Sequence, residues 1–325
     1  MRFVIYGAGG IGGTIGARLF QAGFDVVLIA RGEHGAELRD TGLHFIAPGI
    51  DTRLQIPSVE HPRDIIWQPT DIVMLCMKSQ HTSVALDDLR GAGVREQAIV
   101  CAQNGVANEA MALRRFPNVY AMLVFLPALF LDAGTVITNA TEVGGVLDTG
   151  RYPDGVDQNV ELITDALSAS GFGAAPDTRI MRKKYAKLLS NLNNSLSALT
   201  DFAEGSKAIA KMLHQEALAC YEAAGIDCAG TDEMKALYGQ MTTVSMDEFS
   251  RPGGSSWQSV MRGTGNIEVD YLNGEISELG RRFAIPTPAN VVCQDYAWQL
   301  SHTRQKPGSV EVGELLNAIN AWAGK

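Results

Sequence analysis

The chain has 325 residues, more than a single hydrophobic core usually organises, so two domains are expected. Apolar residues make up 46% and charged residues 19%, which is typical of a globular protein rather than a disordered one. The net charge of −9 disfavours binding to nucleic acid or to an anionic membrane, because both need a basic surface.

The cysteines, the N-terminus and the longest apolar run bear on compartment and metal content. Five cysteines form no CxxC pair and no cluster with zinc-ligand spacing, so we expect reduced thiols, a cytoplasmic protein and no metal site. The first residues show no signal-peptide pattern. The run Val119–Leu131 contains Pro127 and is too short to span a bilayer.

Short β-branched segments alternate with helical patterns in the first half of the chain. Buried strands are predicted at Arg2–Tyr6, Asp25–Ile29, Asp71–Cys76 and Ala98–Ala102. Between the first two strands, Ile11, Ile15 and Leu19 recur every four residues and indicate a helix that ends at Gly23. A hairpin is expected from Leu43–Phe45 and Thr52–Ile56 around Pro48-Gly49, followed by late antiparallel strands at Thr135–Ile137 and Glu142–Leu147. This alternation predicts a doubly wound parallel sheet of the Rossmann type.

From about Asp177 onward, helical patterns dominate. Helices are predicted at residues 178–200, 205–224, 231–243, 264–284 and 287–302. We therefore expect an α/β fold in which residues 1–177 form a Rossmann domain and residues 178–325 form a second, all-helical domain.

A glycine-rich motif, GxGxxG, stands directly after the first strand and opens the first helix. Its residues are Gly7, Gly9, Gly10, Ile11 and Gly12. The first glycine allows a tight turn, the second allows close approach of a pyrophosphate, and the third allows the helix to pack on the strand. In this strand–helix context the motif predicts a dinucleotide-binding site, although a plain flexible turn is the alternative.

The residue that ends the second strand indicates which dinucleotide is bound. NAD-preferring domains carry an acidic residue there, whereas this chain has Arg31. A guanidinium forms charge-assisted hydrogen bonds with a 2′-phosphate, so NADPH is the expected cofactor. An exposed surface arginine beside Glu33 is the alternative.

A polar stripe marks the helix predicted at residues 178–200. Lys187 and Asn191 are four residues apart, and Asn194 falls within about 20° of Lys187 around the helix. When this stripe is taken alone, an ordinary amphipathic helix with a solvated lysine explains it better than a functional site does.

Glu268 favours a functional site over that alternative. It extends by one turn the apolar stripe of Leu272, Ile276, Leu279 and Phe283 in the helix predicted at 264–284. A carboxylate on an inward-facing stripe is costly to bury without a partner, and so it indicates either an ion pair or a site.

Two polar positions follow other predicted strands. Lys78 comes after the third strand and Asn104 after the fourth. The carboxyl ends of parallel strands face the ligand crevice of open α/β sheets. These two residues are therefore candidates for the same site, with a solvated lysine and an Asn-Gly turn as the alternatives.

Taken together, these residues resemble the ketopantoate reductase (2-dehydropantoate 2-reductase) family over nearly the whole chain. The matching elements are Gly7–Gly12, Arg31, Met77-Lys78, Gln103-Asn104-Gly105, Lys187-Leu188 with Asn191, Ser255-Ser256 and the run Glu268–Gly274.

The resemblance implies NADPH-dependent reduction of a small anionic 2-keto acid, with 2-dehydropantoate as the expected substrate in pantothenate biosynthesis. It implies that Lys187 is the general acid and that Asn104, Asn191, Ser256 and Glu268 surround the substrate. In such a site Lys187 and Glu268 are the catalytic candidates. Asn104 is a candidate for cofactor contact as well, and a homodimer is compatible with the sequence.

The chain departs from the family pattern at two places. The family commonly has an asparagine eight residues after the lysine, where this chain has Ser195; Asn194 is the candidate to replace it. After the Ser-Ser pair the family often reads Met-x-Gln-Asp, whereas this chain has Trp257-Gln258-Ser259-Val260. Both departures concern the choice of keto acid.

Two other functions remain open. One is a 3-hydroxyacid or opine-type dehydrogenase with a similar two-domain plan. The other is a non-catalytic NADPH-binding sensor, which would not need Lys187 and Glu268.

Overall fold

The computed structural model describes residues 1–130, 132–246, 254–261, 263 and 267–323. The chain forms two compact units. The sheet unit comprises Met1–Gln103, Ala107–Lys183 and Gly230–Ser250, and the helical unit comprises Asn104–Val106, Lys184–Ala229 and Arg251–Lys325. The division at residue 177 stays a prediction.

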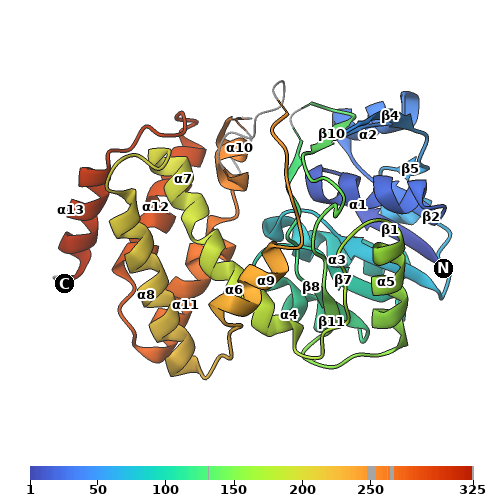
Figure 1. Cartoon of the computed structure of the whole chain (residues 1–325). Coiled ribbons are helices and arrows are strands. Elements are labelled where there is room, and N and C mark those ends of the chain that lie inside the picture. The colour runs from blue at the N-terminus through green and yellow to red at the C-terminus, as the bar shows by residue number, and fades with distance from the viewer. Residues whose placement is uncertain (131, 247–253, 262, 264–266, 324–325) are drawn as a thin grey trace. The chain divides into compact units, whose positions relative to one another are not determined.

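The sheet unit contains a seven-stranded sheet (Figure 1). Its strands in spatial order are β11 (Thr149–Arg151), β8 (Val119–Met122), β7 (Ala98–Cys101), β6 (Asp71–Leu75), β1 (Arg2–Tyr6), β2 (Asp25–Ile29) and β5 (Ser58–Val59). All neighbours pair in parallel except β11, which runs antiparallel to β8. The predicted α/β fold with a doubly wound parallel sheet is therefore confirmed.

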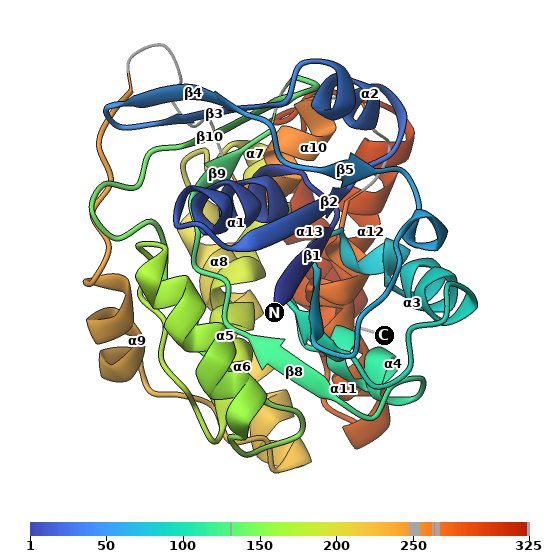
Figure 2. The same cartoon turned by 90° about the vertical axis from the view of Figure 1, so that its right-hand side faces the viewer.

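Both faces of this sheet are buried. Side chains alternate between the two faces along each strand, and each face belongs to its own apolar cluster. Phe3 and Ile5 belong to one apolar cluster, whereas Val4 and Tyr6 belong to another. The first cluster includes residues of helices α1 (Gly10–Gln21) and α5 (Gln158–Ala169), and the second includes residues of α3 (Thr82–Gly91) and α4 (Asn108–Leu113). Figure 2 shows these two pairs of helices on opposite faces of the sheet. Helices thus cover both faces, as the near-continuous apolar strands require.

A smaller four-stranded sheet completes the sheet unit. Its order is β4 (Ile50–Leu54), β3 (Leu43–Ala47), β10 (Thr135–Thr138) and β9 (Ala128–Leu129). The hairpin predicted around Pro48-Gly49 is confirmed as the antiparallel pair β3 and β4. β10 was expected to be antiparallel, but it pairs in parallel with β3 and antiparallel only with β9.

The remaining helices of the sheet unit are α2 (Gly32–Asp40), α9 (Thr231–Tyr238) and the short 3₁₀ helices η1 (Pro62–Asp64) and η2 (Ser79–His81). α1 ends just before Gly23, which adopts the left-handed φ of +88° expected of a helix-terminating glycine. α9 ends earlier than the predicted residue 243, because Gly239 follows its last turn.

The strand predicted at Glu142–Leu147 is wrong. Gly144 and Gly145 interrupt this segment, and glycine gives a strand no side chain to pack. Val146 alone makes isolated bridges, and the real strand, β11, begins at Thr149.

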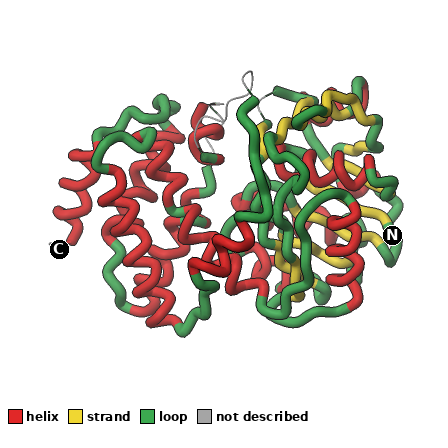
Figure 3. The backbone as a smooth tube through the Cα atoms, viewed as in Figure 1, coloured by secondary structure: helices red, strands yellow, loops and turns green. Residues whose placement is uncertain are grey.

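Within its described residues the helical unit contains helices and no strands (Figure 3). Its elements are α7 (Asn193–Thr200), α8 (Ser206–Ala224), α10 (Ser255–Met261), η4 (Val269–Tyr271), α11 (Asn273–Phe283), α12 (Pro288–His302) and α13 (Val312–Ala323). Helix α6 (Ile180–Asn191) begins in the sheet unit and continues in the helical unit. The all-helical second region is therefore confirmed.

Two predicted helix boundaries in this unit are wrong. The helix expected at 178–200 is interrupted at Leu192, which separates α6 from α7. The helix expected at 264–284 begins only at Asn273, because Leu272 has the non-helical dihedrals φ −118° and ψ −88°. Residues 264–266 of that prediction lie outside the described residues.

In the part of the chain that the structure describes, no helix has the length and apolar character needed to cross a membrane. Val119–Leu131 supplies β8 and β9, and Leu131 itself lies outside the described residues. All five cysteines are free thiols.

Candidate functional site

The glycine-rich turn between β1 and α1 has the backbone geometry that its sequence predicts. Gly7 has a φ of +96°, and a Cβ there would lie 2.8 Å from the backbone nitrogen of Met77. Its N–H donates to the carbonyl of Ile29 at 3.0 Å, which joins the ends of β1 and β2. Only glycine fits such a left-handed and crowded position.

Gly12 brings α1 close to the sheet. A Cβ at this position would collide with the carbonyl oxygen of Gly7 and lie 2.8 Å from Ile5 Cγ2 and 2.9 Å from Cys76 Cβ. Gly12 therefore serves the packing of helix on strand, the role expected of the third glycine.

We expect Gly12→Ala to destabilise the protein by about 2 kcal/mol, because overpacking against fixed backbone outweighs the better helix propensity of alanine. The free energy of unfolding in urea measures this. Gly9→Ala is the matched control, since a Cβ there meets only Phe130 Cδ1 at 3.8 Å. Equal stability of the Gly12→Ala and wild-type proteins would contradict this packing role.

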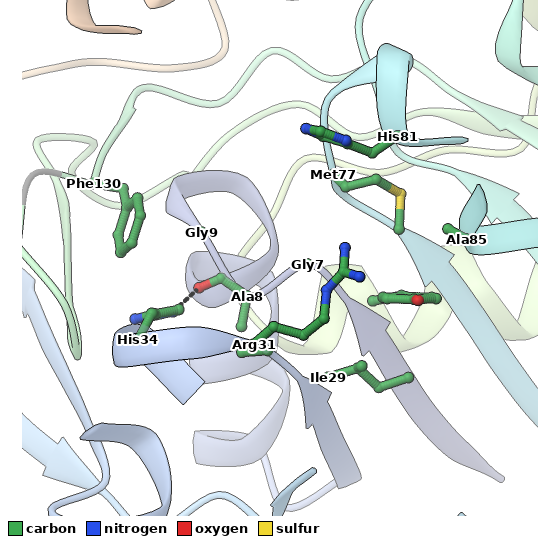
Figure 4. A pocket seen from close by; sticks show the side chains of 12 residues that line it. Gly7, Ala8, Gly9, Ile29, Arg31, His34, Met77, His81, Ala85 and Phe130 are labelled. Carbon is green, nitrogen blue, oxygen red and sulfur yellow. Dashed lines mark hydrogen bonds between the residues drawn. The ribbon is translucent and has the colours of Figure 1, made fainter. Parts of the chain in front are cut away.

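A pocket of about 390 Å³ opens beside the glycine-rich turn (Figure 4). It is lined by Tyr6, Gly7, Ala8, Gly9, Ile29, Ala30, Arg31, His34, Met77, His81, Ala85 and Phe130. All these residues belong to the sheet unit. α1 begins at Gly10, so the N–H groups of its first turn have no partner within the helix. Open space at Gly9 next to these amides fits a pyrophosphate.

Arg31 lies where the sequence predicts it. It follows β2, immediately precedes α2 and is exposed, with its side chain extending into the pocket (Figure 4). Tyr6, on the pocket wall, donates its hydroxyl proton to Asp88 at 3.0 Å. Burial, assisted by this carboxylate, raises the pKa of Tyr6, so the phenol stays neutral near the arginine.

The other predicted cofactor residues take different positions. Gly10 and Ile11 lie in the first turn of α1. A Cβ at Gly10 would lie 3.3 Å from Ala128 Cβ, so this position is close to β9. Lys78 precedes η2 between two pocket residues, Met77 and His81, but it does not itself line the pocket. Its contact with the cofactor stays a prediction.

His34 lines the pocket and was missed by the sequence reasoning. Its Nε2 lies 2.8 Å from the carbonyl oxygen of Ala8, and its Nδ1 accepts the N–H of Gly134 at 2.9 Å. Its ring meets that of Phe130 edge to face, with centroids 4.6 Å apart. Its position in the sequence, three residues after Arg31 and in the first turn of the following helix, could have indicated that it lies near the cofactor site.

A second cluster lies in the helical unit around Lys187. The Lys187 Nζ on α6 donates to Asn104 Oδ1 at 3.1 Å. The segment Asn104–Val106 leaves β7 and packs in the helical unit, where Gly105 adopts a φ of +76° and a Cβ on it would lie 2.8 Å from the carbonyl oxygen of Tyr271. Asn104 is thereby held at the lysine, and the structure does not place it in the pocket of the sheet unit.

Three further candidates belong to the helical unit and are buried. Asn191 is 6% exposed, and its Nδ2 atom has no hydrogen-bond partner among the described residues. Ser256, near the start of α10, is 4% exposed. Glu268 is 9% exposed, as an inward-facing carboxylate should be, although it precedes η4 rather than lying within a long helix.

The residues at which the chain departs from the family pattern lie in or beside α7 and α10. Ser195 is buried and donates its hydroxyl proton to the carbonyl oxygen of Leu192, the residue before α7, at 2.9 Å, so this hydroxyl already has a backbone acceptor. Asn194 is half-buried, and a Cβ on Gly254 would lie 2.8 Å from its Oδ1, which places it beside the start of α10. Trp257 is half-buried on α10.

The parallel sheet, the glycine-rich turn and the pocket beside it define a Rossmann-type dinucleotide-binding protein. Residues 3–152 match the family described as ketopantoate reductase PanE/ApbA, and residues 179–297 match the C-terminal part of the same family. The chain belongs to the ketopantoate reductase family, whose enzymes are oxidoreductases with a nicotinamide cofactor.

Individual relatives agree with this assignment. A 2-dehydropantoate 2-reductase of Pyrococcus horikoshii is 25% identical, over 95% of this chain and 99% of the relative. One from Mesorhizobium japonicum is 27% identical, over 89% of this chain and 94% of the relative. The crystal structure of a PanE/ApbA family ketopantoate reductase from Ralstonia eutropha superposes with a TM-score of 0.79, at 25% identity over 94% of this chain and all of that one.

A different enzyme shares the fold. The ternary structure of a D-mandelate dehydrogenase with NADH and anilino(oxo)acetate has a TM-score of 0.80, at 21% identity over 94% of this chain and 99% of that one. The fold is therefore found in enzymes named for different substrates, and one of them binds NADH.

Proposed function

We propose that this protein reduces a 2-keto acid with NADPH, and in particular 2-dehydropantoate to pantoate. The observation that carries the proposal is the Lys187 ammonium, which donates to Asn104 in a chain of the ketopantoate reductase family. Small anionic keto acids suit a site in which a positive charge is held at a defined position.

Lys187 would act as the general acid. The bound nicotinamide would supply hydride to the keto carbon. Charge then develops on the keto oxygen, and a positioned ammonium that hydrogen-bonds this oxygen and donates its proton lowers the barrier. The Oδ1 of Asn104 accepts one proton of the Lys187 ammonium and would thereby orient this ammonium in the site.

The buried polar residues of the helical unit would hold the substrate. Buried donors are normally satisfied by protein, water or ligand, and the Asn191 Nδ2 has no partner among the described residues. We propose that Asn191 and Asn194 donate to substrate oxygens and that Ser256 binds the carboxylate. Glu268 would accept a hydrogen bond from a substrate hydroxyl, a group that pantoate and its keto precursor carry.

The proposed preference for NADPH rests on Arg31. A charge-assisted contact with the 2′-phosphate contributes about 1.5–3 kcal/mol. We therefore expect Arg31→Ala to weaken NADPH binding roughly tenfold or more with little change for NADH, as measured by titration of each cofactor. Arg39→Ala, on the adjacent helix α2, is the matched control, since Arg39 pairs with Glu60 and is not part of the pocket. Equal affinity of the wild type for NADH and NADPH would contradict the preference.

A substrate panel tests the proposed function directly. The loss of NADPH absorbance is followed with 2-dehydropantoate, other branched 2-keto acids and an aryl 2-keto acid, and 3-hydroxy acids are tested with NADP⁺ in the reverse direction. We expect the highest kcat/KM with 2-dehydropantoate. Preference for the aryl keto acid would instead ally the chain with the D-mandelate dehydrogenase that shares its fold. Binding of NADPH without turnover of any acid would favour a sensor.

The proposed partners are the cofactor and the substrate. A ketopantoate reductase from Staphylococcus aureus with this fold is described as dimeric, at 17% identity and a TM-score of 0.71. A homodimer of the present chain stays a prediction, which sedimentation or light scattering would test.

A further inference from the structure

A histidine outside the glycine-rich turn hydrogen-bonds to it. Neither the glycine motif nor the proposed chemistry gives this histidine a role. His34 lies in the first turn of α2, a helix that begins just after Arg31. Its two ring nitrogens contact two separate segments: Ala8, inside the glycine-rich turn, and Gly134, just before β10. Both contacts are within ordinary hydrogen-bond distance.

These contacts define the protonation state of the ring. The N–H of Gly134 is a donor, so the Nδ1 that receives it must be unprotonated. The proton of the neutral imidazole is then on Nε2, where it is donated to the carbonyl oxygen of Ala8 at 2.8 Å. Burial lowers the pKa of His34, which favours this neutral form.

The position of Ala8 makes this bond relevant to the cofactor. Ala8 stands between Gly7 and Gly9, and the orientation of its peptide group decides where the neighbouring N–H groups point. Without a partner, its carbonyl would be free to rotate toward the pocket and toward the negative charge of a pyrophosphate. The same ring packs edge to face on Phe130, which also lines the pocket.

We propose that His34 is a positioning residue for the cofactor: its neutral Nε2–H holds the Ala8 carbonyl away from the pyrophosphate site and its Nδ1 anchors Gly134. This inference rests on the proposed binding of a nicotinamide dinucleotide. It assigns no contact between His34 and the reacting atoms.

Two conservative variants separate the two hydrogen bonds. In His34→Gln the amide Nε2 reaches about as far as the imidazole Nε2 and keeps a donor for Ala8, but the acceptor for Gly134 is lost. In His34→Asn the amide Oδ1 takes approximately the place of Nδ1 and keeps the acceptor, but the donor is lost. His34→Ala loses both, and His44→Ala, at a histidine that pairs with Asp51 on the neighbouring hairpin, is the control.

The test is fluorescence titration with NADPH together with a melting curve of each cofactor-free variant. We expect the dissociation constant to rise about threefold to tenfold in His34→Ala and His34→Asn, and to stay within about twofold of wild type in His34→Gln. The KM for NADPH should rise in parallel while kcat changes by less than about twofold.

Three outcomes would overturn the inference. They are wild-type affinity in His34→Asn, equal weakening in His34→Gln and His34→Asn, and a loss of kcat without a change in NADPH affinity. If His34→Ala does not fold, the comparison of Gln with Asn carries the test alone. Failure of the wild type to bind NADPH at all would instead contradict the proposed function.

Discussion

Replacing Lys187 with alanine is expected to lower kcat by about 10²–10⁴-fold, the range that general acid catalysis typically contributes. The Lys187 ammonium, which donates a hydrogen bond to Asn104 Oδ1, would no longer be present to protonate the reduced carbonyl oxygen. Because this loss falls on the transition state, NADPH affinity should change by less than about tenfold. Steady-state kinetics on the best substrate and cofactor titration measure the two effects separately.

Lys187→Arg and a remote lysine provide the controls. Arginine should restore little activity, because a guanidinium retains its charge but holds its proton too firmly to donate it. Lys235→Ala, at a lysine 73% exposed on α9, should leave kcat unchanged. A Lys187→Ala enzyme that keeps more than about a tenth of the wild-type kcat would show that the lysine is not the acid.

Gly9→Val is expected to weaken NADPH binding by more than about a hundredfold, which corresponds to about 2.7 kcal/mol, while the protein stays folded. The branched side chain would occupy the space through which the pyrophosphate approaches α1. In the protein alone, a Cβ at Gly9 meets only Phe130 Cδ1, at 3.8 Å. The loss of stability should stay below about 2 kcal/mol, which is the upper range for an unfavourable residue at a helix N-cap.

Gly91→Val is the matched control, because a Cβ at Gly91 meets nothing within 4 Å. Titration with NADPH and a melting curve of each variant distinguish lost binding from lost folding. Unchanged affinity in folded Gly9→Val would remove the glycine-rich turn from the cofactor site.

The sequence was sufficient to predict the α/β fold with a helical second region. Buried parallel strands are continuous apolar runs, and β1 and β2 were predicted to the residue. Interruptions were harder to predict, because Leu192 and Leu272 both fit a helical period. Leu272 has non-helical dihedrals, whereas Leu192 has helical dihedrals and still separates α6 from α7. The strand predicted at Glu142–Leu147 does not form, because Gly144 and Gly145 interrupt its apolar residues.

The candidate site was predictable where a motif or a spacing carries the chemistry. The glycine-rich turn and Arg31 line one pocket, and Lys187 meets Asn104 although 83 positions separate them in the sequence. His34 and Phe130 escaped prediction because their contacts join α2 to segments about 100 residues away, and no local pattern reports such pairing. Glu268 is buried, as predicted, but the predicted reason is wrong. It lies before η4 and not on the long helix whose apolar stripe it was expected to extend.

The central claim is hydride transfer from NADPH to the keto carbon of a 2-keto acid. The most direct measurement uses NADPH that carries deuterium at both positions of the nicotinamide C4, with 2-dehydropantoate as substrate and mass spectrometry of the product. We predict pantoate with one deuterium on C2, the carbon that carried the keto group, formed far more slowly by Lys187→Ala. Consumption of NADPH that leaves this carbon without deuterium, or no consumption with any 2-keto acid, would contradict the claim.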